Sequence, residues 1–247
     1  MRKDPEYLYD KPVKCLVCQE TYTTKKVLSK YIRAHKHDTD FCSHYISTKI
    51  NPLLYYVQVC PNCGYSTSEE FSSFFLPTSF EAIQEKICSN WNGPNYCHER
   101  SLEDAIKSYK LAIYCATIKK EKHITLSGLY LRLAWLYRTE KVNVDEETRF
   151  LHLALTEYIQ SYMYGDFNHT QLTEIKLLYL IGELSRRLRL TTQATRYFSR
   201  VIELQKQTIE KGIVAMAKDR WAEMREEKKL RIQDLIYIDA KSGGNSS

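Results

Sequence analysis

The fold of the first third of the chain is decided by two short stretches, Cys15-Leu16-Val17-Cys18 and Cys60-Pro61-Asn62-Cys63-Gly64-Tyr65. In each of them two residues separate a pair of cysteines, so that one tight turn can direct both sulfurs at a single metal ion. Two such turns complete a tetrahedron of thiolates. We therefore predict one structural zinc ion per chain, bound only by the sulfurs of Cys15, Cys18, Cys60 and Cys63. Because four thiolates leave no open position for water or substrate, the ion is not expected to be catalytic.

The residues around the second cysteine pair support this prediction. Gly64 can adopt the positive φ that turns backbone N–H groups towards the thiolates. The apolar, β-prone run 53–59 predicts a strand that leads into the pair. A redox function is the weaker alternative, because Gly64 follows Cys63 where a thioredoxin-type motif would begin a helix. The 41 residues between Cys18 and Cys60 predict an additional folded insert in a zinc-ribbon-like module.

Composition predicts a soluble, folded protein of the cytoplasm. Hydrophobic residues make up 43% and charged residues 27% of the chain, which is an ordinary globular mixture. The first residues carry charges where a signal peptide needs apolar side chains, and no run approaches the roughly 20 apolar residues of a membrane span. We expect no membrane contact. In a reducing compartment the 8 cysteines are expected to be metal ligands or buried thiols rather than disulfides.

The sequence changes character near residues 77–101. Paired cysteines and turn signals precede this region, whereas no proline follows Pro94 and apolar residues recur at helical spacing. We predict a mainly α protein with a zinc-ribbon-like module over 1–78, a linker with a short helix from Phe80 to Cys88 over 79–100, a helical domain over 101–237 and a disordered tail over 238–247. The helical domain should begin with a capping box at Ser101 and continue over 125–139, 146–164, 171–190 and from 192 onward.

A recurrent pattern relates these helices to one another. Three triplets place a small residue, an aromatic residue four positions later and a small or medium residue at the seventh position: Ala105, Tyr109 and Ala112; Ala154, Tyr158 and Ser161; Ala194, Phe198 and Val201. The pattern resembles the tetratricopeptide helix pair, in which small residues let two helices approach and the aromatic fills the gap. The alternative is an ordinary helical bundle that uses alanine and tyrosine at its seams.

The insert and the second cysteine pair carry a further resemblance. The residues Asp38-Thr39-Asp40-Phe41, Tyr45, Asn51-Pro52, Tyr55 and the segment 60–65 resemble the signature of a bacterial family of uncharacterised proteins. That family combines an N-terminal double-CxxC segment with a tetratricopeptide-like helical remainder, and the resemblance implies no known activity. At the first cysteine pair, Leu16 and Gln19 stand where proline and glycine are expected. This difference concerns the geometry of the turn and not the ligands.

Two other groups of residues have metal-binding chemistry without regular ligand spacing. They are His35, His37, Asp38, Asp40, Cys42 and His44 in the insert, and Cys88, Cys97 and His98 near the linker. A second metal ion at either group is the minor alternative. In the insert, Asp38 and Asp40 are expected to accept hydrogen bonds from backbone N–H groups. Isolated cysteines are usually small buried hydrophobes, and Cys115 on an apolar helix face is expected in the core.

The sequence contains no catalytic motif, because its glycines form no phosphate-binding loop and neither HExxH nor GxSxG occurs. We therefore predict a non-enzymatic adaptor that binds an unidentified protein or peptide through its helical repeats. The tetratricopeptide resemblance places the groove on Leu131, Trp135 and Arg138 of one helix and on Lys176, Tyr179, Glu183 and Arg186 of the next. This set of aromatic and cationic side chains suits an acidic peptide with an apolar anchor. Alternatively, Trp135 packs in the core or against the ribbon.

A nucleic-acid-associated regulator is the alternative function. It would use the ribbon and a basic helical face formed by Arg186, Arg187, Arg189, Arg196 and Arg200. The formal net charge of +6 permits this function without favouring it. Intrahelical pairs such as Glu183 with Arg187 are also expected to neutralise part of the face.

Overall fold

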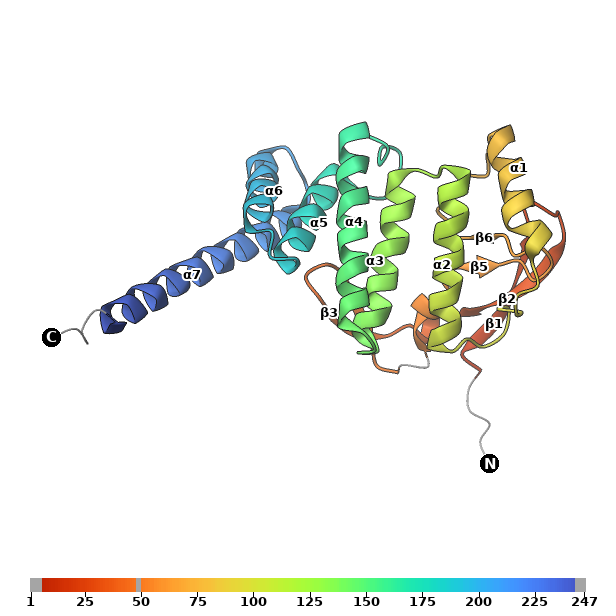
Figure 1. Ribbon diagram of the computed structural model, residues 1–247, viewed down its shortest axis with the longest axis horizontal. Coiled ribbons are helices and arrows are strands. Elements are labelled where there is room, and N and C mark those ends of the chain that lie inside the picture. The colour runs from red at the N-terminus through yellow and green to blue at the C-terminus, as the bar shows by residue number, and fades with distance from the viewer. Residues whose placement is uncertain (1–5, 48–49, 243–247) are drawn as a thin grey trace, which may run out of the picture. The chain divides into compact units, whose positions relative to one another are not determined.

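The computed structural model describes residues 6–47 and 50–242, with side chains described up to residue 230. Figure 1 shows how short β-hairpins precede a series of helices along the chain. Contacts within the chain divide it into two units, residues 1–167 and residues 168–247. The change of sequence character near residues 77–101 lies inside the first unit, where the first helices pack against the cysteine-bearing segment.

In the described residues, the β-structure of the first unit consists of three antiparallel hairpins. They pair β1 (Leu8–Lys14) with β2 (Thr21–Val27), β3 (Ala34–His37) with β4 (Ser43–Tyr45), and β5 (Gln58–Val59) with β6 (Ser66–Thr67). The first hairpin pairs Leu8 with Val27 and Lys14 with Thr21. The first and third hairpins each carry one CxxC turn at their tip, and the second hairpin is the folded insert that the long spacing predicts.

The strand predicted over 53–59 is much shorter in the structure. Residues Pro52–Tyr55 form a 3-10 turn, and only Gln58–Val59 are extended. The Asn51 side chain accepts a hydrogen bond from the Leu53 N–H (3.0 Å), and proline occupies the first turn. These two features start a helical turn locally, and they override the β-propensity of the apolar residues that follow.

The described part of the first unit also contains the α-helices α1 (Pro77–Lys86), α2 (Leu102–Lys119), α3 (His123–Thr139) and α4 (Val144–Tyr164). Helix α1 begins three residues before the predicted start, because Pro77 fits the first helical position and Ser79 is buried inside the helix. The predicted capping box is confirmed, since Ser101 and Asp104 hydrogen-bond each other's backbone N–H.

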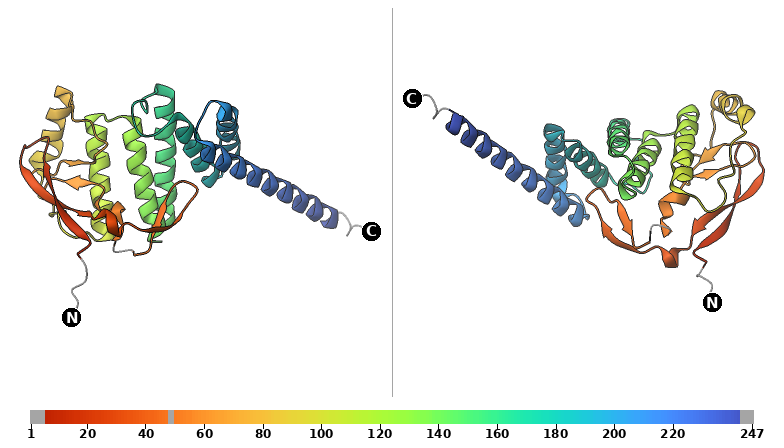
Figure 2. Two further views of the ribbon diagram at one scale, coloured as in Figure 1. Left: turned by 180° about the vertical axis from the view of Figure 1, so that it is seen from behind. Right: turned by 60° about the horizontal axis from the view of Figure 1, so that its bottom comes forward.

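Helices α2, α3 and α4 lie side by side, and the strands of the same unit run along one face of them (Figure 2). All nine residues of the small–aromatic–small pattern are buried: Ala105, Tyr109, Ala112, Ala154, Tyr158, Ser161, Ala194, Phe198 and Val201. Between α3 and α4, the rings of Tyr137 and Phe150 stack with centroids 5.7 Å apart. The pattern thus marks the core positions of the helices.

The second unit consists of α5 (Glu174–Arg187), α6 (Thr191–Glu203) and α7 (Lys211–Ser242). Helices α5 and α6 approach so closely at Gly182 that an added Cβ would lie 2.8 Å from the ring of Phe198. The small–aromatic–small pattern predicts such a contact between a small residue of one helix and an aromatic residue of the next. Helix α7 continues through 238–242, where the sequence predicted a disordered tail, because no glycine or proline occurs between Gly212 in its first turn and Gly243. The remainder of the predicted tail lies outside the described residues.

None of the helices in the described part of the chain combines the length and the apolar character needed to cross a membrane.

Candidate metal centre

The first cysteine pair lies in the turn between β1 and β2. The Cys15 N–H donates to the carbonyl of Glu20 (2.9 Å), and the Gln19 N–H donates to the carbonyl of Cys15 (3.1 Å). The backbone of Gln19 has a φ of +64°, in the left-handed region that favours glycine. Its side-chain amide donates to the Leu16 carbonyl at 3.0 Å and so closes the turn. A non-glycine residue therefore occupies the position where the resemblance leads us to expect glycine.

The second pair, in the turn between β5 and β6, repeats the same backbone hydrogen bonds. The Cys60 N–H donates to the carbonyl of Tyr65 (3.0 Å), and the Gly64 N–H donates to the carbonyl of Cys60 (2.9 Å). Gly64 has a φ of +73°, and a Cβ at this position would lie 2.2 Å from the ring of Trp91. The indole N–H of Trp91 donates to the Pro61 carbonyl at 2.9 Å. Glycine is thus required at residue 64 for its backbone conformation and for the space it leaves.

The two turns bring four sulfurs together. The Sγ atoms of Cys15 and Cys63 lie 3.6 Å apart, as do those of Cys18 and Cys60, and all four sulfurs lie within 4.8 Å of one another. A tetrahedral zinc ion with bonds of about 2.3 Å has sulfur–sulfur distances of about 3.8 Å. The four thiols therefore fit one metal ion of this size without rearrangement of the backbone. The arrangement could hold a metal ion with the four ligands that the sequence predicted.

The thiols are crowded and largely withdrawn from solvent. The pKa of the Cys63 thiol is raised, first by its hydrogen bonds with Cys15 and Cys60 and then by burial. The Val17 N–H lies 3.4 Å from the sulfur of Cys15, where it can stabilise a thiolate. A divalent cation in the centre would offset the repulsion between four such thiolates.

The sulfur cluster is part of a hydrophobic core that joins both hairpins to the helices. The cluster also contains Tyr65 from the third hairpin, Ile83 and Ile87 from the α1 region and Cys115 from α2. Burial raises the pKa of the Cys115 thiol to about 12, and the Ser66 N–H donates to its sulfur at 3.3 Å. The prediction that Cys115 is a core residue is confirmed, because none of its surface is exposed.

The group near the linker does not assemble into a site. In the part of the chain that the structure describes, Cys88, Cys97 and His98 form no cluster with the geometry of metal ligands. Cys88 is half-buried and packs against the four-cysteine core, whereas the thiol of Cys97 faces the Val59 carbonyl at 3.6 Å. Both cysteines are therefore parts of the packing around the hairpins.

The insert behaves differently, because three of its six candidate residues come together. One ligand atom each from Asp38, Cys42 and His44 lies within 4.8 Å of the other two. His37 instead faces the hydroxyl of Ser43 with its Nδ1 (3.0 Å). The ring of His35 makes an edge contact with that of His44 at a centroid distance of 6.3 Å.

Asp38 and Asp40 have more specific partners than the backbone N–H groups that the sequence suggested. Asp40 accepts from the Arg138 guanidinium (2.9 Å) and from the Trp135 indole (3.1 Å), in addition to a longer contact with the Cys42 N–H (3.4 Å). Asp38 accepts from the same guanidinium at 3.2 Å. The expected hydrogen bond from a backbone N–H group is present at Asp40, but the sequence pattern could not include side-chain partners about 100 residues away.

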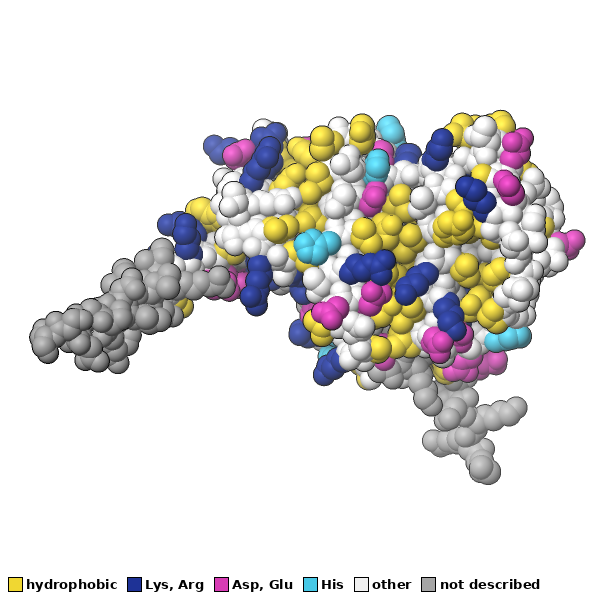
Figure 3. Space-filling view, viewed as in Figure 1, with side chains coloured by type: hydrophobic (Ala, Val, Ile, Leu, Met, Phe, Trp, Pro, Cys, Tyr) yellow, Lys and Arg dark blue, Asp and Glu magenta, His cyan; other side chains and the backbone are white. Residues whose placement is uncertain are grey.

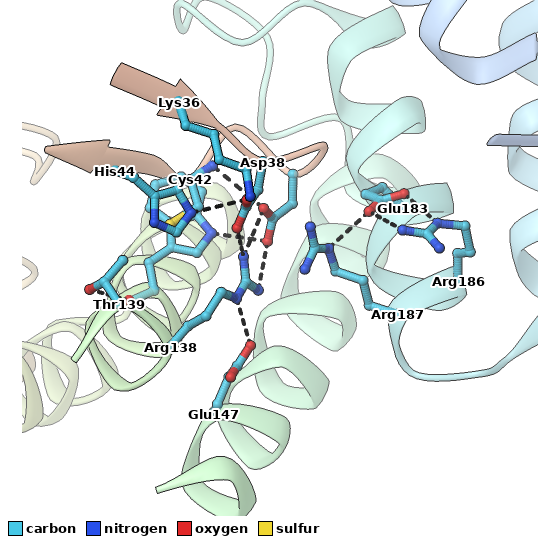
Figure 4. A network of polar contacts seen from close by, with 12 residues as sticks. Lys36, Asp38, Cys42, His44, Arg138, Thr139, Glu147, Glu183, Arg186 and Arg187 are labelled. Atoms are coloured by element: carbon cyan, nitrogen blue, oxygen red, sulfur yellow. Dashed lines mark hydrogen bonds and ion pairs between the residues drawn. The ribbon is translucent and has the colours of Figure 1, made fainter. Parts of the chain in front are cut away.

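Arg138 is the centre of this network, which Figure 4 shows. Its Nε donates to Glu147 of α4 at 2.7 Å, so that one guanidinium contacts three carboxylates. Burial alone would lower the pKa of Arg138, but the contacts with Asp40 and Glu147 raise it overall. The network ties the β3–β4 hairpin to α3 and α4.

Most of the residues predicted to line a groove have little free surface. Leu131 in α3 is buried, and Trp135 and Arg138 contact the insert as described, which agrees with the alternative reading of Trp135 as a packing residue. In the second unit, Tyr179 and Glu183 of α5 are fully buried. The predicted pairing of Glu183 with Arg187 is confirmed (2.8 Å), and Arg186 joins it (2.8 Å). Lys176 pairs with Glu210 at 2.8 Å.

The comparisons with known proteins place the chain in a family. A family model described as "Uncharacterized protein conserved in bacteria (DUF2225)" matches residues 8–224. Because the match covers most of the chain, the protein belongs to this bacterial family, as the resemblance of its sequence indicated. No curated protein and no solved structure matches the chain.

Proposed function

We propose that this protein is a non-enzymatic adaptor of the cytoplasm, in which a structural zinc ion organises a helical surface that binds a protein or peptide. The observation that carries the proposal is the position of the four-cysteine cluster inside a hydrophobic core shared by two hairpins and the helices α1 and α2. A metal in this place stabilises the unit, and its four ligands complete the coordination shell.

Zinc is the metal that best suits the ligands. Four thiolates at tetrahedral spacing select zinc or iron–sulfur chemistry, and two CxxC turns at the tips of hairpins are typical of structural zinc sites. The thiolates require a reducing compartment, which supports the cytoplasm as the location. Treatment with a chelator should therefore release zinc, and the hairpins should unfold as the metal is lost. Release of the metal with the hairpins still folded would contradict a structural role.

The helices supply the binding surface in this proposal. The small–aromatic–small residues, which are buried in α2, α4 and α6, resemble in sequence the tetratricopeptide helix pair, a class of repeat that usually binds peptides. Of the residues predicted for the groove, Lys176 keeps the largest described exposure among the cations, with 38% of its side chain accessible. We propose that α5 contributes Lys176 to the recognition of an acidic peptide.

Charge reversal on α5 tests this proposal. Lys176→Glu should weaken the binding of acidic peptides with one apolar anchor by at least tenfold, measured by fluorescence anisotropy on the full chain. Lys107→Glu is the matched control, because Lys107 lies on another helix and also pairs with a glutamate, Glu103, at 2.7 Å. Both variants should keep their melting temperature, since exposed ion pairs contribute little. Equal peptide affinity of the two variants, or turnover of a metabolite by the purified protein, would overturn the adaptor function.

The described surface gives less support to nucleic-acid binding. Three of the five arginines of the predicted basic face form ion pairs with glutamates: Arg186 and Arg187 with Glu183, and Arg200 with Glu203. Over α2–α4, Figure 3 shows basic side chains separated by acidic and hydrophobic ones. Binding of DNA or RNA whose affinity falls steeply with salt would nevertheless identify this function in the same assay.

A further inference from the structure

The β3–β4 hairpin brings three different metal-ligating groups to one place. Asp38 precedes the tip of the hairpin, Cys42 follows it, and His44 lies in β4. The Asp38 N–H donates to the Cys42 carbonyl at 2.8 Å, and the Phe41 N–H donates to the Asp38 carbonyl at 2.9 Å. These backbone hydrogen bonds fix the tip, so that the side chains on its two sides are held together before any ion binds.

The distances between the donor atoms fit a transition metal. The Nε2 of His44 lies 3.0 Å from Oδ1 of Asp38, and the sulfur of Cys42 is within 4.8 Å of one ligand atom of each of these two residues. Tetrahedral bonds of about 2.0 Å to nitrogen and oxygen separate the two donors by about 3.3 Å. A side-chain movement of a few tenths of an ångström would therefore admit an ion between His44 and Asp38.

The charges around the hairpin also favour a cation. Three carboxylates, those of Asp38, Asp40 and Glu147, contact the single guanidinium of Arg138. Asp40 is fully buried, and the other two carboxylates are only 13% and 18% exposed. Lys36 contributes a fourth contact at 3.5 Å but is largely solvated, with 65% of its side chain exposed. Among these contacts three carboxylates meet two cationic side chains, and a divalent ion would offset the difference.

Arg138 and Asp40 are placed to support the ligands rather than to replace them. Arg138 binds Oδ2 of Asp38, whereas Oδ1 lies 3.0 Å from His44 and 3.5 Å from the largely solvated Lys36. Both carboxylate oxygens of Asp40 contact the Arg138 guanidinium. Its Oδ2 also accepts a hydrogen bond from the Trp135 indole. Ligating carboxylates are commonly held by hydrogen bonds of this kind from a second layer of residues.

We propose that Asp38 Oδ1, Cys42 Sγ and His44 Nε2 bind a second divalent metal ion, of which Zn²⁺ is the best match for a mixed oxygen, sulfur and nitrogen set. Three protein ligands leave one position for water or for a group of a bound molecule. The ion would be the second in the chain, in contrast to the single zinc expected from the spacing of the cysteines. The site stands independently of the adaptor function.

Metal analysis of the full chain tests the site. After equilibration with Zn²⁺ and removal of the free ion, the purified protein should contain two zinc ions per chain. His44→Gln should contain one, and Cys42→Ser should contain one. The matched control is His35→Gln, on the same hairpin and next to His44, which should retain two.

X-ray absorption of the unmodified protein keeps the test independent of how the variants fold. The coordination shell of zinc, averaged over both ions, should contain nitrogen or oxygen ligands in addition to sulfur. The nitrogen and oxygen ligands should be absent in His44→Gln and present in His35→Gln. One zinc per chain with a shell of sulfur only would overturn the proposal. The proposal would also be overturned if the unmodified protein bound two zinc ions and His44→Gln bound the same number with the same coordination shell.

Discussion

The two regions of the first unit in which metal-ligating side chains gather are stabilised by opposite kinds of chemistry. Around Cys60 the sulfurs share an apolar core with aromatic and aliphatic side chains of the hairpins and helices. Around Cys42 the neighbours are carboxylates, a guanidinium and an imidazole. Both regions connect hairpins to helices. The comparison shows that one small unit can attach β-structure to helices either through coordination and apolar packing or through buried ion pairs.

The largest effect is expected from the loss of one sulfur ligand. Cys60→Ser should abolish zinc binding at the four-cysteine cluster and unfold the first and third hairpins together with α1 and α2, because the free energy of metal binding is folding free energy at such a site. Helices α5 and α6 of the second unit should stay folded. Elemental analysis and hydrogen exchange resolved by peptide would measure both results.

The matched control is Cys97→Ser, which makes the same chemical change at a buried thiol outside the cluster. This variant should keep its zinc and its exchange pattern. If Cys60→Ser unfolded both units equally, the chain would be one cooperative domain. If it kept a full complement of zinc, the ligand assignment would be wrong.

A smaller but still large effect is expected at the ion-pair network. Asp40→Ala removes a fully buried carboxylate and leaves the guanidinium of Arg138 partly unpaired, which should cost about 3–5 kcal/mol of unfolding free energy. Asp10→Ala, which breaks the exposed pair with Lys25 on the first hairpin, should cost at most about 1 kcal/mol. Urea denaturation of both variants would give the two values. Equal values would mean that the network contributes no more than a surface ion pair.

An intermediate effect is expected at the turn of the second cysteine pair. Gly64→Ala must place a Cβ against the Trp91 ring in a left-handed backbone conformation, so we expect a loss of roughly 2–4 kcal/mol from strain and overpacking combined. Thermal unfolding of the zinc-loaded protein would measure the loss. Gly212→Ala is a suitable control, because no atom lies within 4 Å of its added Cβ. A Gly64→Ala protein as stable as this control would show that the ring moves away without cost.

The difference between the two regions also explains how far the sequence could predict the structure. Spacing alone identified the four sulfurs, because each pair of ligands is separated by only two residues and is positioned by its own turn. Helical periodicity likewise identified the core positions of α2, α4 and α6. Local patterns were sufficient where the structure depends on local geometry.

Elements that depend on distant partners were predicted less well. Arg138 was assigned to a groove on its helix stripe, yet its carboxylate partners Asp38 and Asp40 lie about 100 residues earlier in the sequence. The convergence of Asp38, Cys42 and His44 depends on a hairpin with an irregular register, for which the sequence has no regular ligand spacing. The sequence offered only one signal of this network: an aromatic and an arginine three positions apart in α3, and two aspartates in the insert.

The smallest effect is expected from Gln19→Gly at the turn of the first cysteine pair. Glycine relieves a left-handed backbone conformation that costs about 1 kcal/mol or more with any other side chain. It also removes the hydrogen bond from the Gln19 amide to the Leu16 carbonyl and gives the unfolded chain more freedom, which together cost a similar amount. We therefore expect the unfolding free energy to change by less than about 1 kcal/mol, with unchanged zinc content. A clear gain in thermal stability would show that the first turn is strained and that the glutamine is retained for another reason. A clear loss of stability would show that the hydrogen bond of the Gln19 side chain stabilises the first turn, as the glycine at residue 64 stabilises the second.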